Sequence, residues 1–183
     1  MSEELLIRHC APTLAGMKTG SLFSAEFESE GSLRETARDF NRRFRHKGLQ
    51  LVPLRYREGL ALLYVYRPGK LAEDLLHEKA VDILTSGGYS PECPGRCIAC
   101  LRRRLTERND FPHEIGLFLG YPPEDVAGFI CNKAKNSKCV GCWKVYGDET
   151  AARKTFDMFR RCTAVYSEQY ARGKSIDRLI VAV

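Results

Sequence analysis

The sequence has no hydrophobic run of the ~20 residues that a bilayer-spanning helix needs, so no membrane span is expected. It also has no internal repeat, no low-complexity stretch and no Ser/Pro-rich linker. Neither G-x-G-x-x-G after a strand nor a G-K-[ST] loop occurs, so a phosphate-cradling nucleotide site is not indicated. The first residues are acidic where a secretory signal would be basic, and we therefore expect a cytoplasmic location. The length of 183 residues predicts a single domain over residues 1–183.

Charge is only mildly unbalanced. The chain has 29 basic and 23 acidic residues, a net charge of +6. Basic residues cluster at 34–47 and 102–104, both in segments expected to be helical, where a solvated helix face is the simpler explanation. A nucleic-acid partner is therefore not expected, and a regulatory nucleic-acid binder that uses the face at 34–47 is kept as an alternative.

Hydrophobic periodicity predicts several helices. The clearest covers residues 152–170, where apolar residues recur every three or four positions on one face. Another is expected from Ser32, with Glu35 completing a capping box, to Gly48. Further helices are expected at residues 68–84, 97–108 and 112–119, and from residue 122.

Strand signals are fewer. The runs at 49–56 and 60–66, joined through Glu58-Gly59, predict a hairpin in which Pro53 marks an edge strand or a bulge. Further strands are expected at residues 21–27, 138–146 and 178–183. Helices and strands do not alternate strictly, so we predict an α+β fold, a small, mainly antiparallel sheet packed with several helices.

In contrast, the sequence is rich in cysteine and contains eight of them. In a reducing compartment they indicate metal ligands or redox groups rather than disulfides. The C-x-x-C pairs Cys97/Cys100 and Cys139/Cys142 each have the spacing at which two sulfurs reach ~2.3 Å from one zinc. The sequence predicts that these four thiolates share a metal site holding zinc or an iron–sulfur cluster. The alternative is unpaired thiols that pack as small hydrophobic side chains.

Cys10 is the candidate reactive thiol. Its segment, His9-Cys10-Ala11-Pro12, is expected to be irregular, so that a thiolate would be accessible. A neighbouring imidazole or ammonium group would lower the pKa of such a thiol. We expect His113 to be its base or co-ligand and Lys18 to be an anion or thiolate partner. The alternative is a buried structural cysteine.

His113 and Glu114 begin a predicted helix directly after Pro112. Imidazole is the natural general base near neutral pH, so His113, with Glu114 after it, is a candidate catalytic residue. A helix cap for His113 and a helix-dipole partner for Glu114 are the structural alternatives. For Trp143, a place in the core is favoured over a box for a flat cofactor.

Three longer strings, His9–Lys18, Phe111–Asp125 and Trp143–Asp148, resemble a bacterial family known as domain of unknown function 3793. The resemblance covers nearly the whole chain. It implies a compact cytosolic domain in iron-limited or redox metabolism, with a flavodoxin-like redox protein as partner. It implies no assigned catalytic residues.

The first hypothesis is therefore a cysteine-based metal, iron–sulfur or thiol redox role. The alternative is a module that binds a small-molecule ligand or a protein without catalysis. Whether the chain is an enzyme is left open by the sequence.

Overall fold

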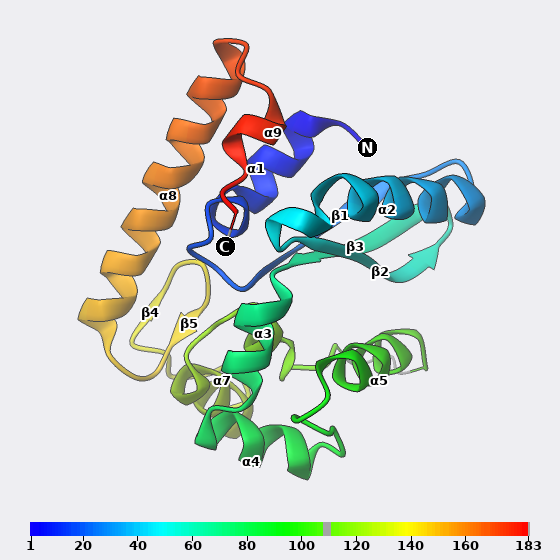
Figure 1. The fold of residues 1–183 in the computed structure, drawn as a ribbon. Helices are drawn as coiled ribbons and strands as arrows, with labels where there is room; N and C mark the ends of the chain where they lie inside the picture. Colours follow the sequence, from blue (N-terminus) through cyan, green and yellow to red (C-terminus); the bar gives the residue numbers. More distant parts are fainter. Residues whose placement is uncertain (108–110, 183) are drawn as a thin grey trace. The chain divides into compact units, whose positions relative to one another are not determined.

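The computed structural model describes residues 1–107 and 111–182 (Figure 1). It confirms the α+β class, with helices and small antiparallel sheets. Contacts within the chain divide it into two compact units, Met1–Gly69 with Cys162–Val183 and Lys70–Arg161. The single domain over residues 1–183 stays a prediction. Within the described ranges, no helix combines the length and apolar character needed to cross a membrane.

The first unit is built on a three-stranded antiparallel sheet. Its strands are β1 (Gly20–Glu26), β2 (Gln50–Arg57) and β3 (Leu60–Tyr66), in the order β1-β3-β2. The predicted hairpin is confirmed, with Glu58 (φ 52°) and Gly59 (φ 83°) both left-handed in its turn. β2 is an edge strand whose register shifts between Pro53 and Arg55, as the proline predicted.

Helix α2 (Glu30–Phe44) packs on β2 and continues into η1 (Arg45–Lys47). Its expected stripe of Leu33, Ala37, Phe40 and Phe44 is buried. The expected start at Ser32 is wrong. The hydroxyl of Ser29 caps the helix by accepting from the backbone N–H of Ser32, and Ser32 takes the position expected of Glu35 in the capping box.

The N-terminal segment is helical, not irregular. Helix α1 (Glu3–Leu14) packs on β1 and β3, and Pro12 lies in its last turn. Residues 178–183 were expected to form a strand, but α9 (Ile176–Leu179) occupies the start of that range, and Val183 lies outside the described residues. An apolar run this short does not distinguish a strand from a turn of buried helix. Ile176, Leu179 and Ile180 join the core that α1, α2 and the sheet share.

The second unit is mainly helical. Its elements are α3 (Pro68–Leu75), α4 (Glu78–Ser86), α5 (Pro94–Glu107), α6 (Ile115–Phe118), α7 (Pro123–Cys131), β4 (Cys139–Val140), β5 (Lys144–Val145) and the start of α8 (Glu149–Ala171). The expected helix at 68–84 is broken into α3 and α4 at Leu76-His77. The expected strand at 138–146 is instead the hairpin β4–β5, which lies beside α7 (Figure 1). The last residue of the helix expected at 97–108 lies outside the described residues.

Candidate functional site

Cys10 is buried, contrary to the expectation of an exposed thiol. It lies on α1 with no exposed surface, in the core of the first unit. Burial raises its pKa to about 12, and the opposing effects of the Lys18 charge and a hydrogen bond with Ser21 are smaller. The Lys18 charge is therefore too weak an influence to make Cys10 a thiolate near neutral pH. His113 belongs to the second unit. Cys10 therefore fits the alternative interpretation, a buried structural cysteine.

We predict that Cys10 in the folded protein reacts with iodoacetamide about a hundredfold more slowly than the exposed Cys142, because alkylation needs an accessible thiolate. Since its folded pKa lies above the ordinary value of 9.0, its contribution to stability is complete below pH 9 and falls as the pH rises toward 12. Mass spectrometry of alkylated peptides measures the rates. Unfolding in urea at increasing pH, compared with Cys10→Ala, measures the stability slope. Equal alkylation of both thiols contradicts the burial of Cys10.

The four predicted metal ligands do not form a shared site. Across residues 1–107 and 111–182, no group of three or more His, Cys, Asp or Glu side chains is arranged to hold a metal ion. Cys97 is buried on α5 and Cys100 is partly buried, whereas Cys142 is exposed in the turn between β4 and β5. The C-x-x-C spacing brings each pair close along the chain but does not bring the pairs together.

Cys97 instead makes a local contact. Its thiol donates to the carbonyl oxygen of Ser90 at 3.0 Å. Burial raises the pKa of Cys97 to about 11, and the charges of Glu92, Cys100 and Cys93 add to the rise. Cys97 is therefore protonated near neutral pH.

Glu114 is held in an ion pair rather than presented to solvent. Arg104 donates to Glu114 Oε1 at 2.5 Å, and the hydroxyl of Tyr89 donates to the same oxygen at 2.8 Å. Arg104 also donates to the carbonyl of Gly87 and lies over the Tyr89 ring. Both charged side chains are largely buried. This arrangement ties α5 to the residue before α6, because the helix begins at Ile115 and not at His113 as expected.

A pocket of about 280 Å³ lies in the second unit. This size is near the lower end of the ~300–1,000 Å³ typical of small-molecule sites. Its lining comes from the segment before α6, from α6 and α7, and from the hairpin β4–β5: Phe111, His113, Ile115, Gly116, Tyr121, Asp125, Val126, Phe129, Val140, Gly141, Trp143 and Lys144. Two of the strings that carry the family resemblance thus meet at this pocket.

Aromatic rings form much of the pocket wall. Trp143 stacks on Tyr121 with ring centroids 4.8 Å apart, and it also packs edge-on against Phe156. Trp143 therefore packs on the small core around Phe156 and also lines the pocket, and a place for a flat cofactor stays a prediction. Burial raises the pKa of Tyr121 to about 12, with a smaller effect from nearby Cys142. A methyl group on Gly141 would overlap the Phe156 ring, so this position needs glycine.

Asp125 fixes the hairpin against α7. Its side chain is almost fully buried, and its Oδ1 accepts the backbone N–H groups of Tyr146 and Gly147, each at 2.7 Å. Its Oδ2 accepts the indole N–H of Trp143 at 2.6 Å. A residue that the sequence assigned to a helix start thus positions the main aromatic wall.

His113 and Lys144 add polar groups to the pocket. The exposed His113 packs edge-on against Phe129, with ring centroids 5.0 Å apart. Lys144 donates to the carbonyl oxygen of Ala134 at 2.7 Å and lies 5.9 Å from the Phe129 ring centroid. Of the predicted catalytic residues, His113 alone lines this pocket.

Sequence reasoning missed the part played by Phe129 and Lys144. Phe129 follows Asp125 by four residues and Val126 by three, so helical spacing could have placed all three on one face of α7. Lys144 gave no comparable signal, because the turn that brings it to the wall was interpreted as continuous strand.

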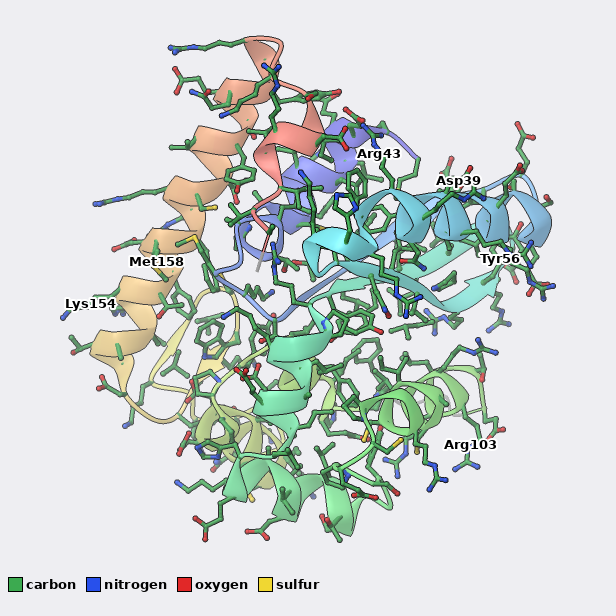
Figure 2. The ribbon with its side chains drawn as sticks, viewed as in Figure 1. Asp39, Arg43, Tyr56, Arg103, Lys154 and Met158 are labelled. Carbon is green, nitrogen blue, oxygen red and sulfur yellow. The ribbon has the colours of Figure 1, made fainter. Side chains whose placement is uncertain are left out.

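Three arginines of α2 form ion pairs with acidic residues. Arg34 contacts Glu30 at 2.7 Å and Arg42 contacts Asp39 at 3.3 Å. Arg43 pairs with Glu3 and Asp177 (Asp39 and Arg43 are labelled in Figure 2). These acids offset the charge on which a nucleic-acid interface would depend. The nucleic-acid alternative stays a prediction.

The fold and pocket describe a helix-rich α+β protein with an aromatic cavity. The chain belongs to the family described as "Protein of unknown function (DUF3793)", whose model matches residues 6–180. No curated protein and no solved structure matches it.

Proposed function

We propose that this chain is a small-ligand-binding protein and that the aromatic pocket of its second unit holds a flat, largely apolar ligand. The observation that carries the proposal is the pocket wall, in which Phe111, Tyr121, Phe129 and Trp143 surround a cavity of small-molecule size. Aromatic faces stack on flat ligands and bury apolar surface at little cost in side-chain entropy.

The rim of the pocket supports the same function. Phe111 is 45% exposed and Val140 is 69% exposed. Apolar side chains that border a concave aromatic surface are typical of ligand-binding sites, because the ligand covers them when it binds. Among the described residues that line the pocket, Asp125 is the acidic one. Three N–H donors engage it, which supports ligand binding rather than acid–base chemistry. The metal, iron–sulfur and redox hypotheses, and the cytoplasmic location, stay predictions.

The single tryptophan provides the test, because Trp143 lines the pocket. Titration with N-phenyl-1-naphthylamine, a neutral aromatic probe, is expected to quench Trp143 emission and raise probe emission together. Phe129→Ala should weaken binding about tenfold, whereas Ile130→Ala, at the exposed neighbour on α7 outside the pocket lining, should change it less than about twofold. Circular dichroism checks that both variants fold.

A second readout needs no variant. Cys142 lies between the lining residues Gly141 and Trp143, whereas Cys131, which is also exposed, is not next to a lining residue. Bound probe should slow the alkylation of Cys142 and leave that of Cys131 unchanged. If the probe neither quenches Trp143 nor protects Cys142, the proposal is wrong.

A further inference from the structure

The lysines around the pocket lie in a stretch that contains no acidic residue, although Asp125 and Asp148 flank it. Residues 126–147, which run from α7 through the hairpin, contain four lysines and no aspartate or glutamate. In a chain with 23 acidic residues, this stretch is a local concentration of positive charge. It includes much of the pocket lining, from Val126 to Lys144.

Lys144 is the lysine that lines the pocket. Its bond to the Ala134 carbonyl uses one of the three N–H donors of the ammonium group. The side chain is partly buried, so its charge is screened less than that of an exposed lysine. The bond to Ala134 thus holds Nζ 5.9 Å from the ring centroid of Phe129, a residue of the pocket wall, and leaves two N–H donors of the ammonium group.

Two further lysines, Lys133 and Lys135, are exposed in the loop that supplies the Ala134 carbonyl. Lys138 is tied to the carbonyl of Gly147 at 2.6 Å. The loop that anchors Lys144 is thus itself basic.

Neither Asp125 nor Glu124 is bonded to Lys144. Asp125 is occupied by the indole N–H and two backbone N–H groups. Glu124 instead forms an ion pair with Lys79, in which Oε1 and Nζ are 2.9 Å apart. A ligand anion at the pocket would therefore meet an ammonium group with no carboxylate bonded to it among the residues that the structure describes.

We infer that the ligand of this pocket is an aromatic anion, a flat ring system carrying a carboxylate, sulfonate or phosphate group that Lys144 binds. The inference rests on the proposed function and adds the charge of the ligand. The rings occupy the wall formed by Tyr121, Phe129 and Trp143, and the acidic group lies toward Lys144 and the loop at 133–135. A charge-assisted hydrogen bond is about twice as strong as a neutral one, which gives the anion its advantage.

The test compares two probes with the same ring framework. 8-Anilinonaphthalene-1-sulfonate carries a sulfonate, and N-phenyl-1-naphthylamine does not. Lys144→Gln is expected to weaken sulfonate binding about tenfold, equivalent to about 1.4 kcal/mol, and to change binding of the neutral probe less than about twofold. Lys144→Arg, which keeps the charge, should restore most of the affinity. Added salt should weaken only sulfonate binding.

Lys154→Gln is the matched control, because Lys154 is an exposed lysine of α8 that projects into solvent (Figure 2). It should leave both affinities unchanged. Because Lys144 also supports the loop, the exposed pair provides a second variant, and Lys133→Gln with Lys135→Gln should weaken sulfonate binding about threefold. If Lys144→Gln weakens both probes equally or neither, the charge inference is wrong while the pocket stands. If neither probe binds the wild-type protein, the proposed function itself is wrong.

Discussion

Replacing Arg67 by methionine is expected to lower the free energy of unfolding by about 4 kcal/mol. The guanidinium of Arg67 is almost fully buried in the first unit and donates to four carbonyl oxygens. They belong to Thr13 at 2.7 Å, Leu14 at 2.7 Å, Lys47 at 3.2 Å and Val181 at 2.8 Å. Methionine fills a similar space but donates nothing, so all four charged hydrogen bonds are lost.

The electrostatics of Arg67 explain why the loss should be large. Two of its acceptors are carbonyls at the C-terminus of α1, where the helix dipole is negative and favours a cation. Another belongs to the last residue of η1. Burial lowers the pKa of Arg67, because removing a charged group from water disfavours its protonated form. The contacts join α1, η1 and the C-terminal segment around a single side chain.

Urea unfolding followed by circular dichroism measures the effect. Arg55→Met is the matched control, because Arg55 is exposed on the edge strand β2, and its replacement should change stability by less than about 0.5 kcal/mol. Arg67→Lys should fall between the two, since lysine keeps the charge but not the planar array of five donors. A loss below about 1 kcal/mol for Arg67→Met would contradict this account.

Elements with local signals could be predicted from the sequence. The hairpin β2–β3 was predicted because its turn, its alternation and Pro53 all agreed. The face of α2 was predicted because four apolar residues repeat at helical spacing. Helix α1 was missed because Pro12 indicates a helix break. Pro12 lies in the last turn of α1, so the one backbone hydrogen bond that it cannot donate is lost where the helix is about to end. Arg67 gave no signal at all, since its partners are distant in sequence.

The site was less predictable, for a related reason. C-x-x-C spacing specifies how two sulfurs lie along one segment, and it does not specify where a second pair lies. His113 was selected for its chemistry and does line the pocket, but its neighbours there are aromatic rings rather than a thiol. The pocket depends on how α7 meets the hairpin, and this contact is made by Asp125, whose sequence context explains it fully as a residue of a helix first turn.

The contact that Asp125 makes between α7 and the hairpin leads to the second prediction with a large effect. Asp125→Ala is expected to cost about 4 kcal/mol in stability and to weaken binding of the aromatic probe more than about tenfold. Three N–H donors, from Trp143, Tyr146 and Gly147, would be left in a largely buried place without their acceptor. The emission of Trp143 during urea unfolding measures the change, since the indole reports on the affected contact.

The adjacent carboxylate is the control. Glu124→Ala removes an exposed ion pair with Lys79 and should cost less than about 1 kcal/mol. Asp125→Asn separates charge from geometry. If its amide oxygen accepts the two backbone N–H groups, its NH2 group faces the indole N–H, and if the oxygen accepts the indole N–H, the NH2 group faces the two backbone N–H groups. If Asp125→Asn retains stability yet loses probe binding, Asp125 acts mainly by orienting Trp143. If Asp125→Ala costs no more than Glu124→Ala, the hairpin is held by the packing of Phe156 and Trp143, and the carboxylate is not what shapes the pocket.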